Sequence, residues 1–413
     1  MGLQKPTDLR RNWTVFFLFL LITLANYGVH IGFSLKPYMI FSLLYFVIMI
    51  SQFRFYHLQL YEVAMLAFYL IYSFTGAFSL YPASSIRIMA GALIYLSCYL
   101  VMKSILEGVH QSIIDKSIGY VGLIFNTASL LLYVIGLKSV GYFFDTEGIR
   151  ISQFGLMIDR NYPRLIGLLQ DPNFFVFYNT VFFAYYLCNS KGWLNKAGLI
   201  LCITTNILTF SRGGLLVMMA LFVLYGLINH PFKQLKMTMG VILSVSFACY
   251  IAIVYLRFDL LSILESRMND FTNDGGSGRI ELWGRAWEYF TTHKVVGIGA
   301  FNFAEYNSFE YGDNLSVHNT FLDVLSESGL LGIFFYLLFL FLVVYQLYQY
   351  KIYKHKPYLF LTVIGMVLQM GFLSVIINDI FFMVLAILST YLNRCKSGTQ
   401  ESTFSMTTVQ KVS

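Results

Sequence analysis

Long runs of apolar residues, separated by short polar stretches, follow one another along almost the whole chain. Crossing a bilayer core takes about 20 mostly apolar residues in a helix, because backbone polar groups must be satisfied within the segment. We therefore predict an all-α, polytopic membrane protein. About twelve transmembrane helices are expected, over residues 13–34, 37–53, 60–80, 86–104, 118–138, 173–189, 193–210, 213–229, 236–256, 321–348, 357–377 and 380–394.

Composition agrees with a membrane as the solvent. Of the 413 residues, 57% are hydrophobic and 12% are charged, and the mean hydropathy is +0.66, far from the values of soluble domains. The first apolar run is longer than a signal-peptide core and lacks a convincing cleavage site, so we expect a retained signal anchor. The five cysteines lie in or beside apolar runs, which indicates neither a disulfide framework nor a metal site.

The distribution of positive charge predicts both termini in the cytoplasm. With the N-terminus inside, cytoplasmic segments hold sixteen Lys and Arg residues and outer segments hold twelve, in keeping with the positive-inside rule. We predict an integral membrane domain over residues 1–395 and a disordered cytoplasmic tail over residues 396–413.

Two predicted outer loops are long, at about residues 139–172 and 257–320, and loops of this length usually carry function. The second contains an amphipathic segment from Arg279 to Phe290, in which Trp283 and Trp287 are four residues apart and share a helical face. Such a helix is suited to the bilayer interface, where tryptophan is favoured, with its polar side facing a cavity.

The outer cations differ in kind from the inner ones. Twelve of the sixteen inner cations are Lys, whereas nine of the twelve outer cations are Arg. Because the Arg guanidinium binds phosphate oxygens in a bidentate manner, this set suggests an anionic, phosphorylated ligand. The alternative is that these arginines snorkel or pair with Asp145, Glu147, Asp259 and Asp270.

One outer arginine, Arg212, lies at the boundary between two predicted helices. Arg212 follows Ser211 and precedes Gly213 and Gly214, which let another group approach closely. An arginine at the membrane rim is costly unless it is paired or liganded. The alternative is a snorkelling arginine in a glycine turn.

In the first long loop, Arg164 precedes the sequence Asp171-Pro172-Asn173 at the start of a predicted helix. Asp171 or Asn173 is expected to cap that helix, with Pro172 tolerated in its first turn. Arg164 is the candidate ligand contact here.

His318 begins the strongest pattern, His318-Asn319-Thr320-Phe321-Leu322-Asp323. A histidine at a helix entrance facing an outer cavity can accept a proton near neutral pH, as a general base must. The alternative is a satisfied helix-cap histidine. The other six histidines form no pair at metal-ligand spacing, so we predict neither a metal nor a cofactor.

Several motifs occur in a suggestive order: Ser211-Arg212-Gly213-Gly214, Ser277-Gly278-Arg279-Ile280-Glu281-Leu282-Trp283, Gly297-Ile298-Gly299 and His318-Asn319-Thr320-Phe321-Leu322. Together with the predicted spans, they resemble the O-antigen ligase and Wzy polymerase superfamily of bacterial membrane glycosyltransferases. The motifs cover residues 160–350, and span number extends the resemblance to the rest of the chain.

The resemblance implies a GT-C-like fold and metal-independent, inverting transfer of an oligosaccharide from undecaprenyl diphosphate. Arg212, Arg279 and Arg164 would hold the diphosphate, and His318 would deprotonate the acceptor hydroxyl, with Gly213, Gly214 and Asn319 in support. The expected location is the bacterial inner membrane, with the active site extracytoplasmic. Expected partners are the lipid-linked donor and acceptor glycans, membrane lipid, and assembly proteins such as a flippase and a chain-length regulator, and not nucleic acid.

Within this superfamily the motifs around residues 164–173 and 210–214 look more similar to the polymerases of O-antigen, capsule or exopolysaccharide. A ligase that transfers polymer to the lipid A core is the alternative. A flippase for lipid-linked oligosaccharide is an alternative of another class, for which charges inside the spans would mark a path.

Overall fold

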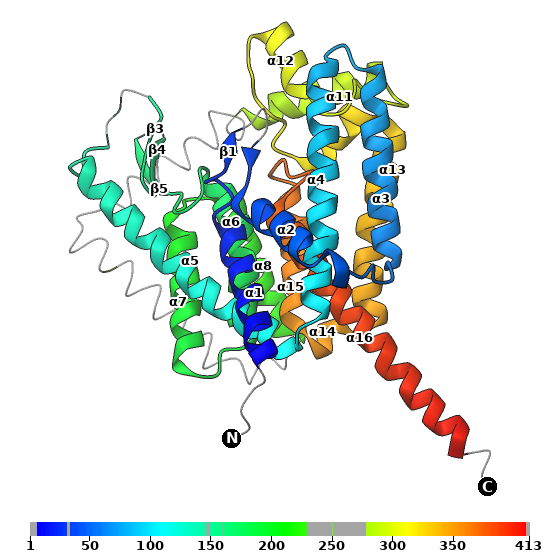
Figure 1. Ribbon diagram of the computed structural model, residues 1–413. Helices are drawn as coiled ribbons and strands as arrows, with labels where there is room; N and C mark the ends of the chain where they lie inside the picture. Colours follow the sequence, from blue (N-terminus) through cyan, green and yellow to red (C-terminus); the bar gives the residue numbers. More distant parts are fainter. Residues whose placement is uncertain are drawn as a thin grey trace.

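The computed structural model describes residues 6–30, 34–144, 146, 149–159, 161–228, 250 and 278–409. The predicted helix over residues 236–256 lies outside this part of the chain except at Tyr250, as do residues 257–277 of the second predicted loop. Helix α1 begins and helix α16 ends at the same end of the molecule, opposite to helices α11 and α12 (Figure 1).

Every other predicted span contains an α-helix. These helices are α1 (Pro6–Thr23), α2 (Pro37–Ile48), α3 (Leu60–Thr75), α4 (Pro82–Glu107), α5 (Gln111–Ser139), α6 (Pro172–Cys188), α7 (Trp193–Leu208), α8 (Arg212–Ile228), α13 (Thr320–Gln349), α15 (Pro357–Met370) and α16 (Asp379–Val409). Short helices η1 (Ile50–Gln52), η2 (Gly76–Phe78) and α14 (Ile352–His355) join some of them.

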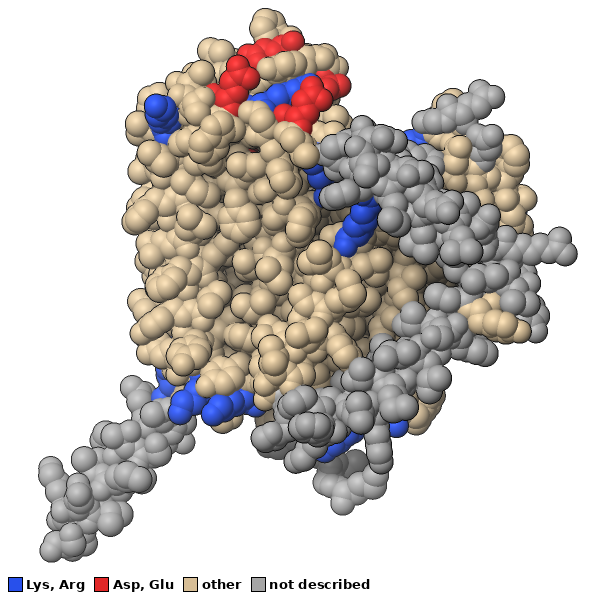
Figure 2. All heavy atoms as spheres, turned by 180° about the vertical axis from the view of Figure 1, so that it is seen from behind, with Lys and Arg blue, Asp and Glu red and all other residues tan. Residues whose placement is uncertain are grey.

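The helices support an all-α membrane fold. Four of those described are long and apolar enough to cross a membrane, namely residues 60–78, α4, α5 and α13. Figure 2 shows, on one face, Asp and Glu at the upper end, and Lys and Arg both at that end and along the lower edge. The twelve crossings and the placement of both termini in the cytoplasm stay predictions. Helix α16 continues to Val409, through the segment predicted as a tail.

The first predicted outer loop contains a small sheet. Strands β3 (Ile151–Gln153), β4 (Leu156–Asp159) and β5 (Tyr162–Leu165) pair antiparallel in that order. The sheet packs on α5, where a Cβ at Gly136 would lie 2.6 Å from the Leu156 Cβ. This close contact explains why a glycine stands there. A second, two-stranded sheet joins β1 (Val29–His30) to β2 (Ser34–Leu35).

The second predicted loop contributes helices α11 (Arg279–Thr292) and α12 (Phe303–Tyr311), which we call, with residues 293–302 and 312–317, the outer head. Its small core consists of Leu282, Ala286, Tyr289, Ile298, Phe303, Tyr306 and Val317. Leu282, Ala286 and Tyr289 lie on one face of α11, while Ile280 and Trp287 are exposed. The amphipathic helix expected from Arg279 to Phe290 is therefore confirmed.

The outer head is fastened to a break in α13. At Gly329 the backbone leaves the helical conformation, with φ 61° and ψ −159°. The freed N–H groups of Leu330 and Leu331 donate to the carbonyls of Lys294 and Val295, at 2.8 and 3.1 Å. The Gly299 N–H also donates to the Glu327 carbonyl at 2.9 Å. The segment that follows α11 is thus held by backbone hydrogen bonds that an unbroken helix would not offer.

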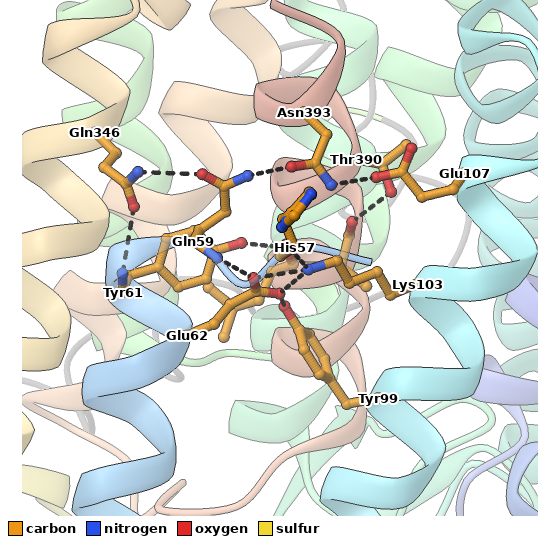
Figure 3. Close-up of polar contacts among 12 residues, drawn as sticks. His57, Gln59, Tyr61, Glu62, Tyr99, Lys103, Glu107, Gln346, Thr390 and Asn393 are labelled. Atoms are coloured by element: carbon orange, nitrogen blue, oxygen red, sulfur yellow. Dashed lines mark hydrogen bonds and ion pairs between the residues drawn. The ribbon is translucent and has the colours of Figure 1, made fainter. Parts of the chain in front are cut away.

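A buried polar network lies at the other end of the bundle (Figure 3). Lys103 of α4 donates to both carboxylate oxygens of Glu62 of α3, at 3.0 and 2.8 Å, and neither side chain is more than 2% exposed. Tyr99 also donates to Glu62, and Gln59 donates to Asn393 of α16. The network joins α3, α4 and α16, and Lys103, near the end of the predicted span over residues 86–104, is a buried partner in it.

Candidate active site

Four helices begin near one another with a charged or titratable residue at their starts. Asp171 is the N-cap of α6, Arg212 and Arg279 are the first residues of α8 and α11, and His318 lies just before the N-cap of α13. The Asp171 and Arg212 charges both act on Arg279, and those of Arg279 and Asp171 both act on His318. We call these four residues the outer charge cluster. Helix N-termini carry partial positive charge, so the cluster is suited to an anion.

Arg212 follows a tight turn between α7 and α8. Phe210 has a left-handed backbone with φ 50°, which bends the chain before Arg212. The Ser211 hydroxyl accepts from the Gly214 N–H at 3.3 Å, which caps α8, and donates to the Asn173 side-chain oxygen at 2.8 Å. The turn is therefore tied to the start of α6, and Arg212 is left half-buried at the rim of the bundle.

Arg164 contacts this turn from strand β5. Its Nε donates to the Thr209 carbonyl at 3.1 Å, and its Nη1 lies 3.3 Å from an oxygen of Asp159. The side chain is 9% exposed on strand β5. These contacts make Arg164 a buttress for the Arg212 turn, and a diphosphate contact from it stays a prediction.

Each carboxylate oxygen of Asp171 has a contact among the described residues. One carboxylate oxygen accepts from the backbone N–H groups of Asn173 and Phe174, at 2.7 and 3.2 Å, which confirms the predicted cap of α6. The other oxygen lies 3.9 Å from the guanidinium of Arg150. The sequence alone predicted Asp171 as a cap and gave Arg150 no role of its own. The acidic N-cap residue that follows the Arg164 segment was the signal in the sequence for this contact.

His318 stands at the entrance of α13 with a strained backbone. Its φ of 56° lies in the left-handed region, which histidine visits more often than most residues. Burial lowers the pKa of the imidazole, and the positive charge of Arg279 lowers this pKa further. The Asp171 carboxylate acts in the opposite direction, and Arg150 lowers the pKa slightly more. The result favours a neutral imidazole, the form that can accept a proton.

Arg279 is half-buried beside this imidazole. Burial lowers the pKa of its guanidinium, the Asp171 carboxylate raises it, and Arg212 lowers it. An arginine still keeps its charge at any working pH. Two like charges held close together favour an anion between them, because the anion relieves their repulsion.

The three residues named as supporting have structural roles. The Asn319 side chain caps α13 by accepting from the N–H groups of Phe321 and Leu322, at 3.0 and 3.2 Å. A Cβ at Gly214 would lie 2.6 Å from Val176 of α6, so this glycine permits close helix packing. A Cβ at Gly213 would lie 3.3 Å from the side chain of Phe372.

Arg285, another outer arginine, is held within the outer head. It pairs with Glu281 and with Asp313, donates to Asn307, and lies over the ring of Tyr311. For this arginine the alternative of ion pairing is confirmed, although its partners differ from the four acidic residues we had considered. In the described residues, His, Cys, Asp and Glu form no group of three that could hold a metal ion.

Comparison with known protein families bears on the same region. Residues 197–337 match the family model described as O-Antigen ligase. The match confirms the resemblance that the motifs suggested, and it spans three members of the outer charge cluster, Arg212, Arg279 and His318. No curated protein matches the chain. Together with the apolar helices, the family match supports a membrane protein and an enzyme of the general ligase and polymerase kind.

Proposed function

We propose that this protein is a polymerase of surface polysaccharide, of the O-antigen, capsule or exopolysaccharide kind. It transfers an oligosaccharide from undecaprenyl diphosphate to a lipid-linked acceptor, with inversion at the anomeric carbon and without a metal. The observation that carries the proposal is the outer charge cluster, in which two half-buried guanidinium groups interact beside an imidazole of lowered pKa.

In the proposed reaction, His318 takes the proton of the acceptor hydroxyl, whose oxygen attacks the anomeric carbon of the donor. The bond from that carbon to the diphosphate breaks, and undecaprenyl diphosphate leaves. Arg212 and Arg279 stabilise the charge that develops on the leaving group. Each charge-assisted hydrogen bond contributes about 1.5–3 kcal/mol, and general base catalysis about a hundred- to ten-thousand-fold in rate.

The start of α6 favours a polymerase over a ligase. Asp171 and Asn173 belong to the sequence that resembles the polymerases, and they contact Arg150 and Ser211 at the cluster. A ligase that transfers polymer to the lipid A core is the second candidate, which the description of the matching family favours. A flippase is less favoured, because charged residues are sparse within the predicted spans, and among them Glu62 and Lys103 pair with each other.

The proposed setting is the bacterial inner membrane, with both termini cytoplasmic and the outer charge cluster extracytoplasmic. Proposed partners are the lipid-linked donor and acceptor, membrane lipid, and a flippase and chain-length regulator of the same assembly. The test supplies purified protein with a lipid-diphosphate oligosaccharide, with and without a chelator. Longer lipid-linked products in both samples are expected. Products seen only when a lipid A core is added would identify a ligase, and transport without bond formation would identify a flippase.

The first prediction concerns His318. His318→Ala is expected to lower the elongation rate at least a hundredfold at normal expression and insertion, because the acceptor hydroxyl loses its base. The measurement is product length over time in the same assay. His293→Ala is the matched control, since His293 is an exposed residue of the outer head away from the cluster. Elongation near the wild-type rate in His318→Ala would remove the proposed base.

A further inference from the structure

Trp283 links the helix that carries Arg279 to the peptide that carries His318. It lies one turn after Arg279 on α11, and its indole N–H donates to the Val317 carbonyl at 3.2 Å. Val317 is fully buried and directly precedes His318. Trp287, one turn further along, is 55% exposed. The two tryptophans therefore differ, although sequence reasoning treated them as one interfacial pair.

The segment around His318 is fixed on its C-terminal side by contacts of other residues. Asn319 caps α13, and both the backbone N–H and the hydroxyl of Thr320 donate to the Leu373 carbonyl. On the N-terminal side, the Val317 side chain packs in the small core with Leu282 and Ala286 of α11, and Trp283 makes the hydrogen bond to the Val317 carbonyl. The backbone of His318 is left-handed. A rotation of the peptide that precedes it would redirect the imidazole.

The other end of α11 is fastened too far away to control this peptide. The hydrogen bonds from Leu330 and Leu331 to residues 294 and 295 lie about three turns along α13 from His318, roughly 15 Å. They hold α11 against α13 as a body. The Val317 carbonyl is held near the start of α11, by the indole N–H of Trp283.

We propose that Trp283 is a positioning residue for glycosyl transfer, whose indole N–H holds the Val317 peptide so that His318 and Arg279 keep their mutual geometry. The inference rests on the function proposed above. A displacement of about 1 Å in a reacting group can lower a rate about a hundredfold. A role in packing alone would need the indole ring but not its N–H.

The experiment removes the N–H and keeps the ring. The variants are Trp283→Phe and replacement of Trp283 by 3-benzothienylalanine, in which sulfur takes the place of the indole N–H without a change of shape. Trp287→Phe is the control on the same helix. Both changes at position 283 are expected to lower kcat at least tenfold with the donor KM within about twofold, while the control stays within twofold in both.

A second readout is the pH profile of kcat/KM. If His318 moves away from Arg279, the acid limb shifts to higher pH in the position 283 variants at an unchanged melting temperature. Wild-type kcat and pH profile in the benzothienylalanine variant would overturn the inference, because packing alone would then explain Trp283. Failure of the proposed function has another signature, namely full elongation by His318→Ala with wild-type Trp283.

Discussion

Arginines of the outer set have different roles according to their partners. Arg164 and Arg285 are buried and paired with carboxylates, so their charges are already neutralised. Arg212 and Arg279 are half-buried at helix starts, and the Arg212 charge lowers the pKa of Arg279. The second pair is suited to bind an incoming anion, since like charges held together are stabilised by a diphosphate.

At Arg212 the geometry of the cation is expected to matter as well as its charge. Arg212→Lys should lower kcat at least tenfold, because an ammonium cannot make the bidentate contact of a guanidinium with a diphosphate. The measurement is single-turnover elongation with saturating donor. Arg87→Lys, at an exposed site on α4, is the control. Full activity of Arg212→Lys would refute the diphosphate clamp.

The acid limb of the activity profile should respond to Asp171. The neutral imidazole is the active form, so activity falls as pH drops through the lowered pKa of His318. Asp171→Asn keeps a good helix cap but removes a negative charge that raises this pKa. The acid limb should therefore move to lower pH. The measurement is kcat/KM between pH 4.5 and 8.

Arg150→Gln is a check on this prediction, because Arg150 acts on the pKa of His318 in the opposite direction to Asp171 and lowers it. Its acid limb should move to higher pH, and by a small amount, since the Arg150 side chain is 56% exposed. Shifts in the same direction for Asp171→Asn and Arg150→Gln would contradict the electrostatic account of His318.

At the scale of elements, the break in α13 explains why both Gly297 and Gly329 are glycines. Gly329 has φ 61° and ψ −159°, a region open essentially to glycine alone. Gly297 approaches the break from the other side, and a Cβ there would lie 2.4 Å from the Glu327 carbonyl carbon. Tyr72 of α3 donates to the Glu327 side chain and accepts from the Phe301 N–H. Helix α3 thus supports the same junction.

Gly329→Ala is expected to lower both stability and activity. A Cβ there would lie 2.5 Å from the Val295 carbonyl carbon, in a backbone conformation that costs about 1–3 kcal/mol for other residues. The measurements are the melting temperature in detergent and the elongation rate. Gly284→Ala on α11 is the control, because its Cβ meets nothing within 4 Å. Equal melting temperatures for the two variants would argue against a strained junction.

At the scale of the whole molecule, two polar regions lie at opposite ends of an apolar bundle. The outer charge cluster is partly exposed, whereas the Glu62–Lys103 pair at the other end is buried and bonded to its neighbours (Figure 3). A buried ion pair is destabilised strongly when one partner is lost, because the remaining charge has no compensation. We interpret the inner network as a joint that keeps α3, α4 and α16 together.

Lys103→Met should lower the free energy of unfolding by about 3–5 kcal/mol, because Glu62 is left buried without its cation. The double variant Glu62→Gln, Lys103→Met should recover most of this loss, since no charge remains unpaired. Lys116→Met, at an exposed position of α5, is the control. The measurement is reversible denaturant unfolding in detergent. A double variant as unstable as Lys103→Met would show that the ion pair is not the cause.

The sequence by itself determined the helices, because apolar runs and the Asp171 cap depend on residues that are neighbours in the chain. It also predicted Arg212, Arg279 and His318 as site residues by residue type and by resemblance, and the family match agrees with that resemblance. The tertiary structure decided how Arg164 and Arg285 are paired, because Arg164 meets Thr209 and Arg285 meets Asp313 only when separate elements pack. It likewise separated Trp283 from Trp287 and buried Lys103 against Glu62. Pairing and burial depend on contacts between residues far apart in the chain, and local patterns carry no information about such contacts.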